Sequence, residues 1–539
     1  MASTSIPADQ VDGTPPLSFH DTWRPRANPW LIAITVTLAT FMEALDSSIA
    51  NVALPHIAGS LSASTDEGTW VLTSYLVSNA VVLPISGWIS NRIGRKRFYM
   101  MCVLLFTVTS FLCGLAPSLG MLVLFRVIQG AAGGGLQPSE QAILADTFPP
   151  AKRSMAFAVY GMAVVLAPAI GPTVGGWITD NYSWRWLFFL NIPVGIISLY
   201  FTRKLVEDPP YLDSYKKKRI PIDYYGLGLL VVGIGALQMM LDKGQEDDWF
   251  SSRFIVTCAF AAAITLLLFL VRELTTEHPI VDLQLFRNRN FAMTQLVMFM
   301  VGASLYSTTV LIPQFLQQLM GYTAERSGMA ISVGGLVLMV LFPLAGFVTT
   351  RFDPRFIVTC GFLVTTMGLL RMTNLNLGIG FMTAVSWRAV IACGLPFLFV
   401  PINTMCYIGI PQNKNNEVSG MNSLMRNLGG SVGISFVTTL IARRAQTHQA
   451  MLSANIAPGS PAYQNMLGSM TGAFHQKGWA TPDAAYHAGG QLYRMMLTQS
   501  YTLAYVDTIW VLVLMTACLI PIPYLMQRPK KGHASAPMH

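Results

Sequence analysis

Fourteen long apolar runs constrain the fold of this chain more than any other feature of its sequence. A helix needs about 20 mostly apolar residues to cross the hydrocarbon core of a bilayer. Runs of about this length lie near residues 30–55, 68–90, 98–118, 119–143, 155–178, 186–202, 226–242, 252–271, 291–317, 326–349, 356–376, 380–408, 419–442 and 501–526. Because a spanning segment must satisfy its own backbone hydrogen bonds, these runs predict helices. We therefore expect an all-α polytopic membrane protein with 14 spans.

The composition excludes several other classes of protein. Hydrophobic residues make up 53% of the chain and charged residues 11%, whereas soluble domains have about 25% charged residues. The net charge of +9 comes from short basic clusters between the apolar runs, a pattern that indicates contact with the lipid bilayer and no nucleic acid. The seven cysteines show no C-x-x-C spacing, so neither a disulfide framework nor a metal site is expected.

The basic residues also predict the orientation of the chain. If the amino terminus is cytoplasmic, 23 of the 35 lysines and arginines fall inside, 8 fall outside and 4 lie within spans. The positive-inside rule then places both termini in the cytoplasm, as a segment of residues 1–29 and a tail of residues 528–539. Residues 1–29 are too long and polar for a signal peptide, so the first span should be retained.

Repeated sequence features predict two similar halves. The pattern Gly-x-x-x-x-Arg occurs at Gly87 to Arg92 and again, 259 residues later, at Gly346 to Arg351. Other pairs keep nearly this offset: Leu54-Pro55 with Ile312-Pro313, Gly161-Met162 with Gly420-Met421, Gly171 with Gly430, and Arg126 with Arg388. Two copies that run in the same direction imply an axis along the membrane normal and a substrate site between the halves. We expect six-helix halves at 30–202 and 289–527, with a linker and two extra spans in 203–288.

Several motifs carry a resemblance to a known family. They are Leu45-Asp-Ser-Ser-Ile-Ala-Asn-Val-Ala-Leu-Pro55, Gly87-Trp-Ile-Ser-Asn-Arg-Ile-Gly-Arg-Lys-Arg97, Arg126-Val-Ile-Gln-Gly130, Pro149-Pro-Ala-Lys-Arg153, Ala167-Pro-Ala-Ile-Gly-Pro-Thr-Val-Gly-Gly176 and Trp184-Arg-Trp186 with Asn191-Ile-Pro193. In this order the chain resembles the fourteen-span drug:proton antiporters of the major facilitator superfamily, especially the EmrB-type multidrug export permeases. The resemblance implies the major facilitator fold, a multi-pass location in a bacterial inner membrane, and export of hydrophobic or amphipathic compounds. It also implies a proton gradient as the energy source, with no cofactor.

Ionisable residues inside spans are the candidates for proton coupling. Glu43 and Asp46 are three residues apart and share one helix face. A buried aspartate costs about 2.5–3.5 kcal/mol on insertion scales, so it should face a cavity or a partner. The resemblance assigns Asp46 to proton coupling or cation binding and Arg126 to a proton relay, while neutralisation for packing alone is the alternative. Glu140, Asp507 and Arg388 also lie inside spans and remain further candidates.

The motif after the second span has a glycine for close helix packing and a cluster of cations. Its candidate residues are Gly87, Asn91, Arg92, Gly94 and Arg95. The resemblance implies that they latch the outward-open state, although Asn91 stands where an aspartate is common. This departure favours a latch held by hydrogen bonds over one held by a charge relay. Compliance with the positive-inside rule alone is the alternative.

The fifth span carries a second set of candidates. Prolines remove backbone donors and glycines allow close packing, so this span should bend and contact another helix closely. The residues are Pro168, Gly171, Pro172, Gly175 and Gly176. The resemblance associates this motif with antiporters and therefore with export; an ordinary kinked helix is the alternative.

The substrate and the partners are less constrained by sequence. Polar and aromatic candidates for the wall of a central cavity are Gln129, Gln295, Tyr306, Gln314 and Asn403. The long exterior segment 443–500 is expected to be a partly helical flap or docking surface, and the resemblance implies a periplasmic adaptor protein and an outer-membrane channel as partners. A dedicated transporter of one metabolite or siderophore is the alternative. An enzyme is disfavoured, because no catalytic constellation and no Walker phosphate loop is found.

Overall fold

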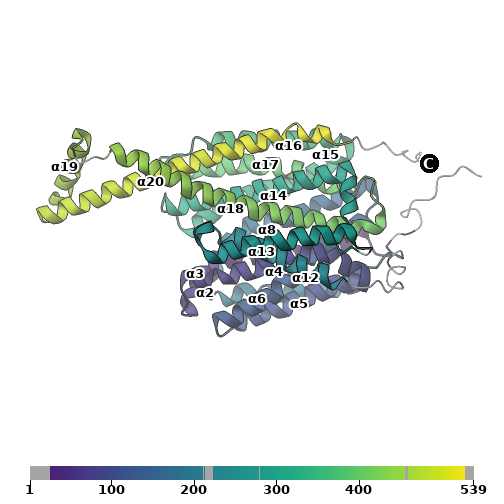
Figure 1. Cartoon of the computed structure of the whole chain (residues 1–539). Coiled ribbons are helices and arrows are strands. Elements are labelled where there is room, and N and C mark those ends of the chain that lie inside the picture. Colours follow the sequence, from purple (N-terminus) through teal and green to yellow (C-terminus); the bar gives the residue numbers. More distant parts are fainter. Residues whose placement is uncertain are drawn as a thin grey trace, which may run out of the picture.

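The computed structural model describes residues 23, 25–210, 212, 223–277, 279–455 and 459–527, and these are helical with no strand among them. The helices lie side by side in one elongated bundle (Figure 1). The described residues do not include residues 1–22 and 528–539, which make up most of the predicted terminal segments. They also do not include residues 213–222 of the predicted linker. The predicted all-α membrane architecture is confirmed.

The first predicted half contains nine helices and one 3₁₀ turn. They are α2 (Pro29–Ser60), α3 (Thr65–Gly68), α4 (Trp70–Ile93), α5 (Arg95–Leu115), α6 (Leu119–Gly133), α7 (Leu136–Thr147), η1 (Pro150–Lys152), α8 (Arg153–Asn181), α9 (Arg185–Phe189) and α10 (Asn191–Leu205). The span expected near 119–143 is divided into α6 and α7. At the break, a Cβ on Gly134 would lie 2.5 Å from the Asn79 carbonyl oxygen, so the chain approaches α4 closely there.

The inserted segment and the second predicted half complete the described fold. The insertion contains α12 (Tyr224–Lys243), η2 (Trp249–Ser251), α13 (Arg253–Thr275) and η3 (Leu283–Arg287). The second half contains α14 (Arg289–Gln318), α15 (Ala324–Arg351), α16 (Pro354–Met372), α17 (Phe381–Met405), η4 (Gln412–Lys414), α18 (Asn415–Asn455), α19 (Pro461–Gln476), α20 (Thr481–Leu519) and η5 (Ile522–Leu525).

Several helices begin at residues whose side chains cap the free backbone amides of the first turn. Asn28 accepts a hydrogen bond from the Trp30 amide at 2.9 Å at the start of α2, where Pro29 also fits the first helical position. Asp223 accepts from the Gly226 amide at 3.0 Å at the start of α12. Asn288 accepts from the amides of Asn290 and Phe291 at the start of α14. Local sequence therefore fixes where these helices begin.

Among the described residues, 13 helices are long and apolar enough to cross a membrane. The predicted span at 419–442 is the exception and lies within α18, which packs against α4, α14 and α20. Its buried side chains include Asn422, Ser423 and Arg426. These polar groups face neighbouring helices and lower the apolar character of the helix, so composition alone does not identify it as a span. The count of 14 spans remains a prediction.

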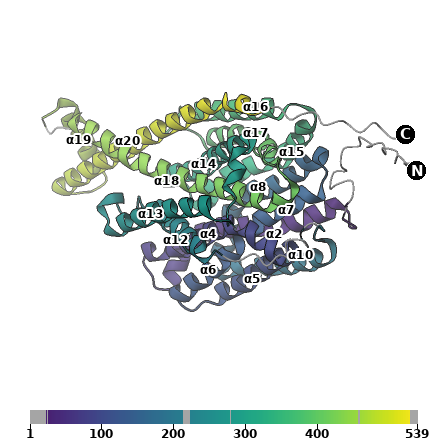
Figure 2. The same cartoon turned by 45° about the vertical axis from the view of Figure 1, so that its right-hand side comes forward.

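Helices α18 and α20 continue past the bundle and form, with α19, an arm that projects from one end (Figures 1 and 2). The predicted exterior segment 443–500 lies in this arm and is mostly helical. The start of α2 and the end of α20 lie at the opposite end of the bundle (Figure 2).

The repeated glycine motif makes equivalent contacts in the two predicted halves. A Cβ on Gly87 of α4 would lie 2.8 Å from the Asn416 carbonyl oxygen of α18. A Cβ on Gly346 of α15 would lie 2.9 Å from Ala158 Cβ of α8. In each case the glycine permits a close helix contact between one half and the other.

The inserted helix α12 also contacts both halves, at their arm-side ends. Gln238 donates a hydrogen bond to Ser431 of α18 at 2.8 Å, and Lys243 donates to Thr69 beside α4. Trp249 of η2 donates to Thr439 of α18 at 3.0 Å. The insertion thus covers the junction between α4 and α18.

The helix contacts predict a strong effect of substituting Gly302. A Cβ on this residue of α14 would lie 2.2 Å from the backbone oxygen of Arg426 in α18. Because backbone cannot move aside as a flexible side chain can, we expect Gly302→Ala to lower the free energy of unfolding by about 1–3 kcal/mol or more. Gly228→Ala in α12 is the matched control, since a Cβ there meets nothing within 4 Å. Melting temperatures in detergent should fall for the first variant only; equal values for both would contradict this packing.

Candidate functional site

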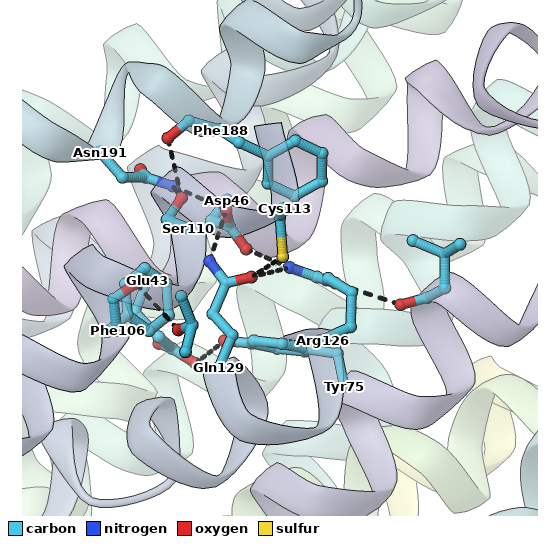
Figure 3. Close-up of polar contacts among 12 residues, drawn as sticks. Glu43, Asp46, Tyr75, Phe106, Ser110, Cys113, Arg126, Gln129, Phe188 and Asn191 are labelled. Atoms are coloured by element: carbon cyan, nitrogen blue, oxygen red, sulfur yellow. Dashed lines mark hydrogen bonds and ion pairs between the residues drawn. The ribbon is translucent and has the colours of Figure 1, made fainter. Parts of the chain in front are cut away.

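A buried ion pair between Asp46 of α2 and Arg126 of α6 forms the centre of the site (Figure 3). Arg126 Nη1 donates to Asp46 Oδ2 at 2.6 Å. The other oxygen of Asp46, Oδ1, accepts from Asn191 Nδ2 of α10 at 2.7 Å and from Gln129 Nε2 of α6 at 3.2 Å. Both charged side chains are at most 2% exposed, so each charge is compensated within the protein.

Neighbouring helices hold the two members of the pair in place. Arg126 also donates to the Val71 carbonyl at 3.1 Å and to Gln129 Oε1 at 2.9 Å, and its guanidinium lies 4.1 Å from the centre of the Tyr75 ring. Asn191 donates in addition to Ser110 of α5 at 2.9 Å. The pair is therefore connected to α2, α4, α5, α6 and α10, which are all in the first half.

Glu43 lies one turn before Asp46 on α2 and has different partners. Its carboxylate accepts from Tyr75 at 3.1 Å and Asn79 at 3.3 Å, both in α4, and from Gln137 Nε2 of α7 at 2.6 Å. The Gln137 side-chain oxygen in turn accepts from Arg426 of α18. A short chain of hydrogen bonds thus joins this carboxylate to a cation of the second half.

A cavity of about 220 Å³ lies beside these groups and between the halves. Its walls include Glu43, Tyr75, Asn79, Arg126, Gln137 and Pro168 from the first half and Tyr306, Thr309, Val310, Asn427 and Ile434 from the second. Asp46 is not among the lining residues, because Arg126, Gln129 and Asn191 enclose it. A molecule or a proton in the cavity therefore meets Glu43 and Arg126 before Asp46.

The five residues expected to line the cavity lie in different surroundings. Tyr306 lines the cavity, whereas Gln129 bonds to Asp46 and Arg126. Asn403 is buried and accepts from Asn422 at 2.8 Å. Gln295 is buried with no hydrogen-bond partner for its amide among the described residues, and Gln314 is half-buried. Gln137 and Asn427 were missed, because an amide in a helix gives no sequence signal of the cavity it faces.

The predicted latch lies where α4 meets the start of α18. Asn416 Nδ2 donates to Asn91 Oδ1 at 2.6 Å, and Asn91 Nδ2 donates to Glu417 Oε1 at 3.4 Å. Gly94 has a φ of 95°, a conformation that favours glycine. Arg92 lies on the surface side of this motif, with its guanidinium 5.5 Å from the Trp88 ring. The side-chain amide of Asn91 thus accepts from Asn416 and donates to Glu417.

A charged group also belongs to this contact. Arg95 Nη1 donates to Asp146 Oδ2 of α7 at 2.5 Å, and Asp146 Oδ1 accepts from Asn415 of α18 at 2.6 Å. Sequence reasoning missed Asp146 and Glu417, since neither falls in a motif. Glu417 supplies a carboxylate opposite Asn91, so an aspartate at position 91 would place two negative charges together.

The prolines of α8 create a contact with α2. Pro172 lacks the amide that would bond to the Pro168 carbonyl one turn earlier. Ser48 of α2 donates to that carbonyl at 3.2 Å. A Cβ on Gly171 would lie 2.4 Å from the Ser48 hydroxyl, and one on Gly175 would lie 3.1 Å from Ile49. Pro168 also lines the cavity, whereas a Cβ on Gly176 would meet nothing within 4 Å.

The remaining intramembrane candidates have local partners. Glu140 of α7 is fully buried and accepts from Thr37 at 2.5 Å, and its second oxygen has no hydrogen-bond partner among the residues that the structure describes. Asp507 of α20 lies near the base of the arm, where His448 Nε2 is 3.0 Å away and Arg444 Nε is 3.7 Å away. No group of three or more His, Cys, Asp or Glu in the described part of the chain could hold a metal ion.

Comparison with known proteins identifies the family of this bundle. The model of the Major Facilitator Superfamily matches residues 36–434. The chain belongs to the major facilitator superfamily. It is therefore a membrane transporter and not an enzyme, and the family together with the apolar helices confirms the predicted multi-pass membrane location.

Relatives and solved structures agree with this assignment. The chain is 38% identical to the multidrug export protein EmrB of Escherichia coli K12, over 82% of this chain and 86% of that protein. It is 39% identical to the fatty acid resistance protein FarB of Neisseria gonorrhoeae, over 80% and 84%. The structure resembles the proton:xylose symporter XylE, with a TM-score of 0.56 at 13% identity over 92% of this chain and 96% of that one. The human organic anion transporter MFSD10 has a TM-score of 0.55 at 14% identity, over 77% and 94%.

The contact between Asn91 and Glu417 predicts that restoring the common aspartate is harmful here. Asn91→Asp should destabilise this conformation by on the order of 1 kcal/mol, because two partly screened carboxylates would face each other. Adding Glu417→Gln should restore stability, since an amide again faces a carboxylate. Melting temperature and transport rate would measure both effects. A single Asn91→Asp variant as stable and active as the unaltered protein would show that this contact does not hold the two helices together.

Proposed function

We propose that this protein exports hydrophobic or amphipathic compounds across a bacterial inner membrane in exchange for protons. The observation that carries the proposal is the buried Asp46–Arg126 pair directly behind a cavity that Glu43 and Arg126 line. Carboxylates at membrane depth are costly and usually serve transport or proton transfer. The relatives named for multidrug export and fatty acid resistance support export of amphipathic compounds as the activity.

The exchange requires that proton and substrate favour different states of the protein. A ligand shifts the equilibrium between two conformations only by its difference in affinity for them. Substrate in the cavity would contact Glu43 and also Arg126, the partner that holds Asp46 in its charged form. Occupation of the cavity and protonation of these carboxylates therefore compete.

Arg126 connects protonation with movement. When the Asp46–Arg126 pair is closed, both buried charges are compensated. A movement that separates them leaves two unpaired charges, which is costly in a protein interior. Protonation of Asp46 removes one of these charges and so favours the state in which the pair is open.

Glu43 connects protonation with the contact between the first half and the second. Its carboxylate holds Gln137, and Gln137 holds Arg426 of α18. Protonation of Glu43 weakens its acceptance of the Gln137 hydrogen bond, because a neutral acid is a poorer acceptor than a carboxylate. The contact between α7 and α18 is then easier to break, so the halves can rock.

The closed side of the cavity lies away from the arm. The latch of Asn91, Asn416 and Glu417 is at the start of α18, whereas the arm is at its far end. If the arm is exterior, as the charge distribution predicts, the latch closes the cytoplasmic side. The cytoplasmic side of the cavity is then the closed one in the described conformation.

The arm is proposed to dock a periplasmic adaptor protein that leads to an outer-membrane channel. Its exposed side chains include Met466, Trp479, Tyr486, Tyr493 and Met495. Apolar and aromatic groups of this kind are enriched in protein interfaces.

Shortening the arm tests this partner. Leu452 of α18 and Gln491 of α20 line the same groove, so removal of residues 455–490 should allow a short connection between the two helices. We expect transport into vesicles to stay near its original rate, while drug resistance of whole cells falls strongly. Equal loss in both assays would make the arm part of the transport pathway or the fold and would contradict the docking role.

A neutral substitution at Asp46 tests the coupling. Asp46→Asn keeps the shape and can still bond to Arg126 but cannot exchange a proton. We expect a folded protein that binds substrate with less dependence on pH, whereas export driven by a pH gradient falls at least about a hundredfold, as for loss of an essential proton-transfer group. Glu43→Gln should slow export less severely. Gradient-driven export by Asp46→Asn at the original rate would remove Asp46 from the coupling mechanism.

A further inference from the structure

Arg388 of α17 is a buried cation without an acidic partner among the described side chains. It is 4% exposed, and its nitrogens Nη1 and Nη2 donate to the hydroxyls of Thr308 at 3.0 Å and Thr309 at 3.1 Å. Its Nε has no hydrogen-bond partner in the described part of the chain. An arginine stays charged in proteins, and a buried charge is costly unless an opposite charge compensates it. The negative charge that compensates Arg388 must therefore come from a group other than the described side chains.

The internal repeat shows that this lack is specific to the second half. Arg388 corresponds to Arg126, whose charge is balanced by Asp46. The offset of 258 that relates Leu54-Pro55 to Ile312-Pro313 relates Asp46 to Ser304. A hydroxyl thus stands where the first half has a carboxylate. Within the described residues, the first half neutralises this buried arginine with an acid of its own and the second half does not.

Arg388 faces a recess that adjoins the main cavity. The recess has a volume of about 20 Å³, and its other walls are mostly apolar or small, with Leu305, Leu338, Gly334 and Gly335 among them. It shares four lining residues with the main cavity: Val164, Pro168, Tyr306 and Thr309. The guanidinium, which has no acidic partner among the described side chains, therefore lies at a closed end of the space that substrates would occupy.

We propose that Arg388 binds the carboxylate or sulfonate group of an anionic amphipathic substrate, whose apolar part lies in the main cavity. This rests on the proposed export function and adds the charge of one substrate class to it. A guanidinium presents several N–H donors to two anionic oxygens and forms stronger hydrogen bonds with them than with neutral hydroxyls. The hydroxyls of Thr308 and Thr309 hold the guanidinium in place.

The recess must widen for the anion to enter. Its volume in this conformation suffices for about one water molecule. Gly335 of α15 lies against Leu166 and Ala169 of α8, where a Cβ would be 3.2 Å and 3.0 Å from them. Separation of α8 and α15 as the halves rock opens this end of the cavity. The anionic head group of the substrate then compensates the charge of Arg388. The acid Glu43 lies in the wall of the main cavity that the first half forms.

Two small ions with equal tails and opposite charges test the proposal. Octanesulfonate and octyltrimethylammonium remain charged at every pH, so their binding is independent of any proton taken up by a carboxylate of the ligand. Equilibrium binding to the full chain in lipid nanodiscs, corrected with empty nanodiscs, would be measured for the unaltered protein, Arg388→Gln, Arg388→Lys and Arg371→Gln. Arg371 is an exposed cation at the end of α16 and serves as the matched control.

We expect Arg388→Gln to weaken octanesulfonate binding at least about tenfold, the loss of roughly one charge-assisted hydrogen bond. Octyltrimethylammonium binding should change less than about twofold in the same variant, a difference below the energy of one hydrogen bond. Arg371→Gln should leave both ions unaffected. Arg388→Lys keeps the charge and serves as the test variant if the glutamine variant does not fold. It should weaken binding of the anion but not of the cation, since an ammonium cannot bind two oxygens at once as a guanidinium does.

Any of three results would overturn the proposal. They are no saturable octanesulfonate binding to the unaltered protein, unchanged octanesulfonate binding in both Arg388 variants, and an equal weakening of octanesulfonate and octyltrimethylammonium binding in these variants. The assay uses no proton gradient. Failure of proton exchange in vesicles would therefore contradict the proposed function without changing the binding result, and loss of anion selectivity would leave proton exchange of cationic or neutral compounds intact.

Discussion

The ion pair between Asp46 and Arg126 is the interaction on which the rest of the site depends. Neither charge could remain alone at this depth, because removal of one partner of a buried pair typically costs about 3–5 kcal/mol. Asn191, Gln129 and the Val71 carbonyl fix the pair from three further directions. The first half is thereby held as one unit around α2, and the cavity opens on the side of Arg126 that faces the second half.

The two halves share a helical plan but differ in how they compensate charge. The first half holds acids, with Asp46 enclosed and Glu43 in the cavity wall. The second contributes cations, Arg426 linked to Glu43 through Gln137 and Arg388 in the recess. Proton exchange and recognition of substrate charge can therefore reside on opposite walls of one cavity. In the proposed mechanism, the contact of Asn91 with α18 determines which side of the membrane the cavity faces.

Sequence reasoning predicted those features that follow from depth in the membrane. Apolar length identified most of the helices, and the cost of a buried charge drew attention to Asp46 and Arg126. It could not give their mutual contact, because a span position does not specify which helices become neighbours. For the same reason Gln129 was expected in the cavity although it holds the ion pair. Asp146 and Glu417 were missed, since a charge near a helix end is common and acquires its role only through α18.

Substrate-dependent proton movement across vesicles that contain only this protein tests the central claim most directly. The vesicles would carry a pH-sensitive dye and a preformed pH gradient, with protein-free vesicles as the reference for leakage. The account predicts that an amphipathic substrate makes the gradient decay faster, and that the added proton flux saturates with substrate and runs opposite to substrate movement. Saturable substrate movement that is the same with and without the gradient, and moves no protons, would contradict it.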